Sequence, residues 1–140
     1  MNATRVLVDT GPLVAVFSPS DAHHATCVKQ LHEIRPPLFT CWPVITEAAW
    51  LLRQRPASIQ QLLACFDTGI FRLLTLGDEA PAWIARFLER YRQIGAQVAD
   101  AALVYLAERE SIETVFTLDR RDFLIYRLSR NRSLRLLPPP

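Results

Sequence analysis

Short apolar runs alternate with longer amphipathic segments along nearly the whole chain, and this alternation constrains the fold more than any other feature. The runs lie at residues 5–8, 38–41, 71–76, 114–117 and 134–137. Each has the length and composition of a buried strand. Strands that alternate with helices form a parallel sheet with helices on both faces. We therefore expect an α/β fold with a mainly parallel sheet.

The intervening segments carry helix signals. The segment 13–17 follows a turn at residues 9–12, and a helix is expected over residues 20–34, with Ser20 as its N-cap. One helix is expected to begin at Pro43, and a separate helix is expected to end at about Asp67. Three more are expected from about Pro81 to Gly95, over 98–110 and over 121–128. With 140 residues, half of them apolar, the chain fits one domain over residues 1–137, followed by a proline tail at 138–140.

Charge and cysteine content bound the class of protein. The formal net charge of +2 is too small to indicate nucleic-acid binding alone, but Lys29 is the only lysine among 16 basic residues. Arginines crowd the last fifth of the chain, and their forked guanidinium groups suit phosphate oxygens, although a solvated face is the alternative. The three cysteines form no C-x-x-C pair, and the sequence shows no leader and no membrane-length apolar run. We expect a cytoplasmic protein with reduced thiols and no membrane partner.

Four carboxylates occur in apolar surroundings, where an unpaired acid is costly. Asp9 closes the run 6–8, Glu47 and Asp100 lie on the apolar stripes of two expected helices, and Asp119 follows the run 115–118. Ligands of parallel α/β sheets bind beyond the carboxyl ends of the strands, where Asp9 and Asp119 fall. Clustered carboxylates suit Mg²⁺ or Mn²⁺, which prefer oxygen ligands. The pattern therefore favours metal-dependent phosphodiester hydrolysis, although each acid alone could be a helix cap or a salt-bridge partner.

Four segments resemble the motifs of PIN-domain proteins of the VapC-like toxin type. Residues 8–13 resemble the opening aspartate motif, Thr46-Glu47 the second acid, 98–102 the third, and 116–123 the closing T-x-D-x-x-D-F. They occur in the family's order and span nearly the whole chain. The resemblance implies a three-layer α/β/α sandwich and a Mg²⁺- or Mn²⁺-dependent ribonuclease. It also implies a homodimer and, often, an antitoxin protein that occludes the site.

The resemblance also assigns the candidate residues. The catalytic and metal-binding quartet would be Asp9, Glu47, Asp100 and Asp119. Asp122 would either assist the metal or cap a helix, and we favour the cap. Candidates for contact with metal-bound water or phosphate are Thr10, Thr117, Arg120 and Arg121, with ordinary turn roles as the alternative for the threonines.

The expected function is that of an endoribonuclease acting as the toxin of a type II toxin-antitoxin pair. Three alternatives stay open. The first is a PIN nuclease that processes RNA without a toxin role, and the second is a non-catalytic module whose acids bind a partner's arginines. The third is a metal-dependent phosphatase with Asp9 as nucleophile, which the lack of a second acid two residues after Asp9 makes weaker.

Overall fold

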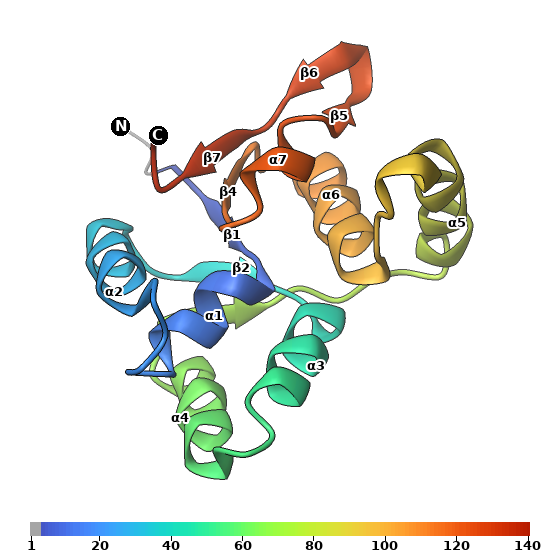
Figure 1. Cartoon of the computed structure of the whole chain (residues 1–140). Coiled ribbons are helices and arrows are strands. Elements are labelled where there is room, and N and C mark those ends of the chain that lie inside the picture. The colour runs from blue at the N-terminus through green and yellow to red at the C-terminus, as the bar shows by residue number, and fades with distance from the viewer. Residues whose placement is uncertain (1–3) are drawn as a thin grey trace.

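The computed structural model describes residues 4–140 and contains a five-stranded sheet in the order β3-β2-β1-β4-β7 (Figure 1). All neighbouring strands in this sheet are parallel. The strands are β1 (Val6–Val8), β2 (Leu38–Thr40), β3 (Phe71–Leu73), β4 (Thr114–Phe116) and β7 (Arg135–Leu137). The expected α/β fold with a parallel sheet is confirmed.

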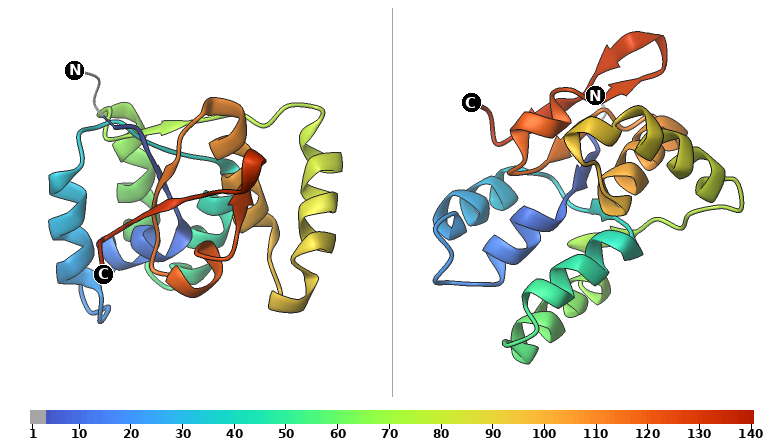
Figure 2. Two further views of the ribbon diagram at one scale, coloured as in Figure 1. Left: turned by 90° about the horizontal axis from the view of Figure 1, so that it is seen from above. Right: turned by 45° about the vertical axis from the view of Figure 1, so that its right-hand side comes forward.

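Helices cover both faces of the sheet. They are α1 (Thr10–Val16), α2 (His24–Glu33), α3 (Trp42–Leu51), α4 (Pro56–Asp67), α5 (Ala80–Arg90), α6 (Val98–Glu110) and α7 (Arg120–Phe123). Helices α1 and α2 lie on one side of the strands, and α5 and α6 on the other (Figure 2). Helix α3 contacts both α1 and α6. The result is the α/β/α sandwich that the sequence resemblance implied.

Helix α6 is the most deeply buried helix of the fold. Its buried residues form a continuous run from Ala101 to Ala107, and Ala99 is buried as well. A helix that is apolar around its whole circumference belongs inside a protein, and the small alanine side chains let neighbouring elements approach closely. Because Asp100 lies in the first turn of α6, this candidate residue is carried by a rigid element.

Three local predictions were wrong in extent. The helix expected from Ser20 begins at His24, because Asp21 accepts a hydrogen bond from the His23 N–H in a turn. Residues 13–16 belong to α1, which starts directly after Asp9 and has Phe17 as its C-cap. The strand expected over 71–76 ends at Leu73.

The helix expected over 121–128 was also wrong. After the short α7, the chain turns into β5 (Arg127–Leu128), which pairs with β6 (Arg132–Ser133) in an antiparallel hairpin through the 3₁₀ turn Ser129–Asn131. The Arg127 guanidinium donates hydrogen bonds to the carbonyls of Leu124, Ile125 and Tyr126. These carbonyls therefore have a partner outside a helix.

Over residues 4–140, no helix is both long and apolar enough to span a membrane.

Candidate metal centre

The predicted acids come together at the carboxyl edge of the sheet. Asp9 directly follows β1, and Asp119 follows β4 after two residues. Glu47 on α3 and Asp100 on α6 reach the same place from the helices, and Asp122 joins them from α7. All five carboxylates line one cavity of about 390 Å³. Glu47 is half-buried and lines this cavity.

Three of these acids form a tight group. One carboxylate oxygen each from Asp100, Asp119 and Asp122 lies within 4.8 Å of the other two. Asp119 also caps α7, since its Oδ1 accepts a hydrogen bond from the Asp122 N–H at 3.2 Å. The favoured assignment of the cap to Asp122 was therefore wrong. The Asp122 carboxylate does not cap the helix and belongs to the group of three acids.

Asp9 is the most buried of the five acids, with 6% of its surface exposed. Thr117 donates its hydroxyl to Asp9 Oδ2 at 2.8 Å and accepts from the Asp119 N–H at 3.0 Å. The pKa of Asp9 is raised to about 7, mainly by burial and also by the charges of Asp100 and Glu47, against the opposing hydrogen bonds from the Thr10 backbone and Thr117. Without a cation, this carboxyl is therefore partly protonated near neutral pH.

Asp100 is held by a buried tyrosine that sequence reasoning missed. The Tyr126 hydroxyl donates to Asp100 Oδ2 at 2.8 Å, and the Tyr126 side chain has no exposed surface. Burial raises the pKa of Asp100, and the charges of Asp119 and Glu47 add to this, while the Tyr126 hydrogen bond opposes it. Tyr126 could not be recognised in the sequence because nothing distinguishes it there from an ordinary core aromatic residue.

The cavity has the composition that a divalent cation requires. None of the residues that line it is basic. Among residues 4–140, no ion pair involves any of its five carboxylates. Thr10 also lines the cavity, and its buried Oγ1 has no hydrogen-bond partner in the described part of the chain. Uncompensated carboxylates and a free hydroxyl oxygen fit a hard cation such as Mg²⁺ or Mn²⁺.

The sequence profile of the PIN domain matches residues 6–130, which include all of these acids. The chain belongs to the PIN domain family. Ribonuclease VapC26 of Mycobacterium tuberculosis is 28% identical to this PIN domain over 120 residues, which are 84% of this chain and 89% of that protein. The expected resemblance to VapC-like proteins is thereby confirmed.

A solved structure shares the fold of this PIN domain. The crystal structure of Mycobacterium tuberculosis VapC20, described as a Sarcin-Ricin loop cleaving toxin, aligns with a TM-score of 0.76 at 19% sequence identity. The alignment covers 83% of this chain and 91% of VapC20. At this low identity the likeness establishes the shared fold.

The other residues predicted to contact phosphate, apart from Thr10, do not line the acidic cavity. Thr117 is fully buried and donates its hydroxyl to Asp9, and its contact with metal-bound water or phosphate stays a prediction. Arg120 donates to the Pro138 carbonyl at 2.7 Å, and Arg121 is exposed. Neither arginine lines the acidic cavity.

Proposed function

We propose that this PIN domain is a Mg²⁺- or Mn²⁺-dependent endoribonuclease. The observation that carries the proposal is the cavity lined by five carboxylates and by no basic residue. Its relative VapC26 bears the name ribonuclease, which supports RNA as the substrate class. The proposed catalytic residues are Asp9, Glu47, Asp100 and Asp119, with Asp122 as a further metal ligand.

The chain's own groups have distinct roles in this proposal. The group formed by Asp100, Asp119 and Asp122 would supply three carboxylate oxygens to one ion. Tyr126 and Thr117 fix the orientations of Asp100 and Asp9 by hydrogen bonds. A bound divalent ion would lower the pKa of a coordinated water and stabilise charge on the phosphate during in-line displacement. Asp9 would lose its proton when the ion binds, so binding should weaken as the pH falls below about 7.

The decisive experiment is cleavage of a pool of structured RNAs by the purified protein with Mg²⁺, Mn²⁺ or EDTA. Asp100→Asn removes one ligand charge and should abolish cleavage without unfolding the protein. Asp67→Asn is the matched control, because Asp67 is exposed at the end of α4 and lies outside the cavity. Cleavage that survives in EDTA or in Asp100→Asn would refute the proposal, and the non-catalytic module would then be favoured.

We further propose that the protein is the toxin of a type II pair and acts in the cytoplasm on RNA. The relation to VapC proteins, one of which is described as a toxin, supports this role. Expression of the wild-type chain should arrest growth, and Asp100→Asn should not. An antitoxin protein would be co-purified from its native source. Active nuclease without growth arrest would favour RNA processing.

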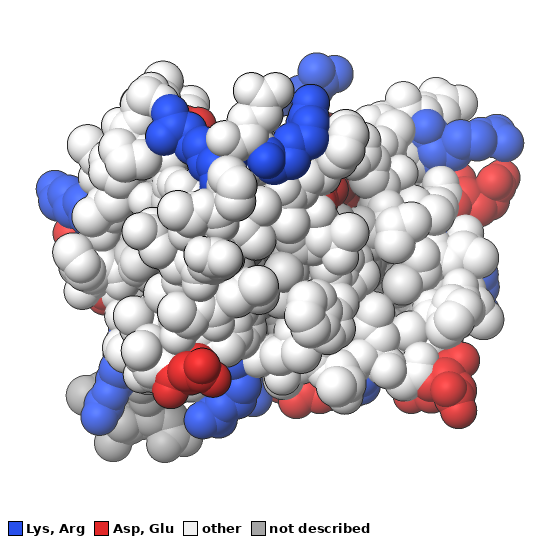
Figure 3. All heavy atoms as spheres, turned by 90° about the horizontal axis from the view of Figure 1, so that it is seen from below, with Lys and Arg blue, Asp and Glu red and all other residues white. Residues whose placement is uncertain are grey.

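A homodimer is the remaining part of the proposal. The exposed large apolar side chains include Trp42, Trp50 and Leu51 on α3 and Val98 at the start of α6. The face formed by α3 and α4 is largely uncharged in its centre (Figure 3). Exposed apolar surface of this kind favours association, here with a second copy. Sedimentation should give the mass of a dimer for the wild type and of a monomer for Trp50→Glu.

A further inference from the structure

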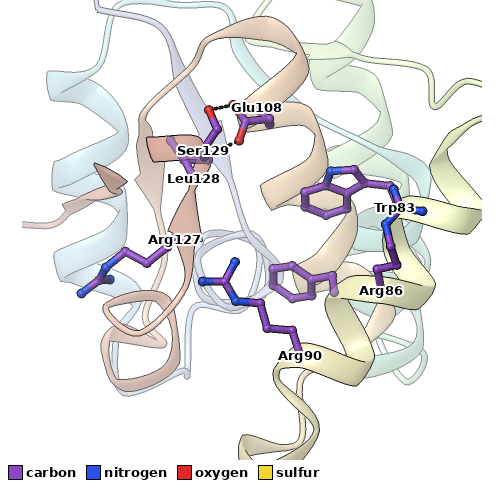
Figure 4. Close-up of a pocket in the computed structure, with 8 residues that line it drawn as sticks. Trp83, Arg86, Arg90, Glu108, Arg127, Leu128 and Ser129 are labelled. Atoms are coloured by element: carbon purple, nitrogen blue, oxygen red, sulfur yellow. Dashed lines mark hydrogen bonds between the residues drawn. The ribbon is translucent and has the colours of Figure 1, made fainter. Parts of the chain in front are cut away.

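A second cavity, away from the acids, is lined by arginines. It measures about 250 Å³ and lies between α5, the end of α6 and β5 (Figure 4). Its lining residues are Trp83, Arg86, Phe87, Arg90, Glu108, Arg127, Leu128 and Ser129. In Figure 4 the Arg90 side chain extends from α5 toward Arg127 on the facing strand. The Arg127 side chain extends away from Arg90 in this view and donates to the carbonyls of residues 124–126, so Arg86 and Arg90 of α5 carry the free positive charge of the lining.

The arginines of this cavity have no acidic partners. In the described chain, no carboxylate forms an ion pair with Arg86, Arg90 or Arg127. Arg90 lies over the ring of Tyr91, with its Cζ 5.0 Å from the ring centroid. The Arg127 guanidinium donates only to backbone carbonyls. All three positive charges therefore remain uncompensated.

The single acid in the lining is already engaged. Glu108 accepts hydrogen bonds from the N–H and the hydroxyl of Ser129 at 2.6 and 2.9 Å, and it forms an ion pair with Arg132 at 3.4 Å. It is thus neutralised from outside the cavity. The cavity presents a positive field to any ligand that enters it.

The rest of the lining is aromatic and apolar. Phe87 and Leu128 are buried, and Trp83 stacks on Phe87 with ring centroids 5.5 Å apart. Poorly hydrated surface next to guanidinium groups strengthens their attraction for anions, and arginine forks match phosphate oxygens. Aromatic surface beside arginines is typical of single-stranded nucleic-acid sites. These features favour a nucleotide phosphate over a carboxylate.

The cavity and the acidic centre are connected through α6 and Tyr126. Asp100 and Glu108 lie on α6, and their separation of eight residues spans roughly 12 Å of helix. The ring of Tyr126, which holds Asp100, packs on Phe87 at 4.9 Å between centroids. An RNA strand that is cut at the acids would need only a few nucleotides to reach the arginines.

We propose that this cavity binds a phosphate group of the RNA strand outside the cleaved bond. The inference rests on the proposed ribonuclease function and names Arg86 and Arg90 as the residues that hold the phosphate. It explains how a centre lined by five acids and by no basic residue retains a polyanion. The positive charge is supplied at a distance from the metal, where it does not compete with the ion for the carboxylates.

The test is RNA binding measured by fluorescence anisotropy in EDTA, where the proposed nuclease does not cut. Arg86→Gln/Arg90→Gln removes two exposed charges. The matched control is Arg55→Gln/Arg72→Gln, which removes the same charge from exposed sites outside this cavity. For long single strands the cavity variant should bind about tenfold more weakly, and the slope of log K against log salt should shrink by about 0.7 for each phosphate that the variant no longer neutralises.

Two further comparisons complete the experiment: the length of the RNA oligonucleotide and the chemical class of the competing ligand. Oligonucleotides too short to span the two sites can still place a phosphate in the arginine cavity, so the cavity variant should bind them more weakly than the control does. Inorganic phosphate and a polyglutamate peptide are the competitors. Competition by phosphate alone at low concentration would show a site for a free ion, and preference for the peptide would show a protein-binding site; either result would overturn the proposal.

The outcome separates the two levels of inference. If the wild type cleaves RNA but the cavity variant binds RNA as the control does, the arginine site is refuted and the nuclease stands. If the wild type neither binds nor cleaves RNA, the proposed function fails and the arginine site fails with it.

Discussion

Asp9→Asn should stabilise the metal-free protein above neutral pH. Asp9 is almost fully buried among other acids, and its pKa rises from 3.8 to about 7 because burial disfavours the charged carboxylate. A carboxyl with a raised folded-state pKa favours folding most at low pH. This advantage begins to fall above the unfolded pKa and is lost as the pH passes the folded value near 7.

The magnitude follows from that shift. A change of roughly three pKa units corresponds to about 4 kcal/mol between the fully protonated and fully ionised limits. Asparagine has no charge to bury, and its amide oxygen can still accept the Thr117 hydroxyl hydrogen bond. At high pH the variant should therefore have a free energy of unfolding larger than that of the wild type by most of this amount. For a domain of this size, such a gain corresponds to a rise of about 10 °C in Tm.

The assay is thermal unfolding of both proteins in EDTA at about pH 5 and about pH 8.5, then with Mn²⁺ added. The wild type should lose stability between the two pH values, whereas Asp9→Asn should change much less. Mn²⁺ should raise the Tm of the wild type at high pH more than that of the variant, which keeps the group Asp100, Asp119 and Asp122 but has no buried charge to neutralise. Equal stability of the two proteins in EDTA at high pH would refute the buried-charge argument, and Asp67→Asn should behave as wild type throughout.

Three further changes separate the roles of the surrounding groups. Tyr126→Phe keeps the aromatic packing but loses the hydrogen bond to Asp100, so Mn²⁺ affinity, read from the dependence of Tm on Mn²⁺ concentration, should fall about tenfold while the metal-free Tm changes little. Thr117→Val leaves the buried Asp9 without its donor and should cost about 2 kcal/mol in denaturant unfolding, and Thr117→Ser should recover most of it; equal costs would contradict the role of the hydroxyl. Asp119→Ala should be about 1 kcal/mol less stable than Asp119→Asn in EDTA, because asparagine can still cap α7, while both should lose the stabilisation by Mn²⁺.

The parts of the site that could be predicted are those tied to repeating backbone patterns. An apolar run identifies a strand, and parallel strands end at a common edge, so the meeting of Asp9 and Asp119 follows from the chain alone. The helical periodicity placed Glu47 and Asp100 on apolar stripes, but it could not distinguish the core from the wall of a cavity. That distinction depends on which neighbouring helix packs there, here α6 against α3.

The parts that could not be predicted depend on single side-chain partners. The cap of α7 passes from the expected Asp122 to Asp119, since a small offset along the chain decides which carboxylate meets a free N–H. The expected helix over 121–128 fails because Arg127 satisfies three carbonyls that a helix would otherwise use. Neither choice leaves a periodic signal in the sequence.

The burial of α6 has a consequence for how the protein fluctuates. A helix packed on all sides opens only when the whole domain unfolds, so its amides should be among the slowest to exchange with deuterium. The short hairpin β5–β6, whose second strand is exposed, should exchange faster. Asp100, carried in the first turn of the buried helix, should therefore keep its place when the hairpin opens.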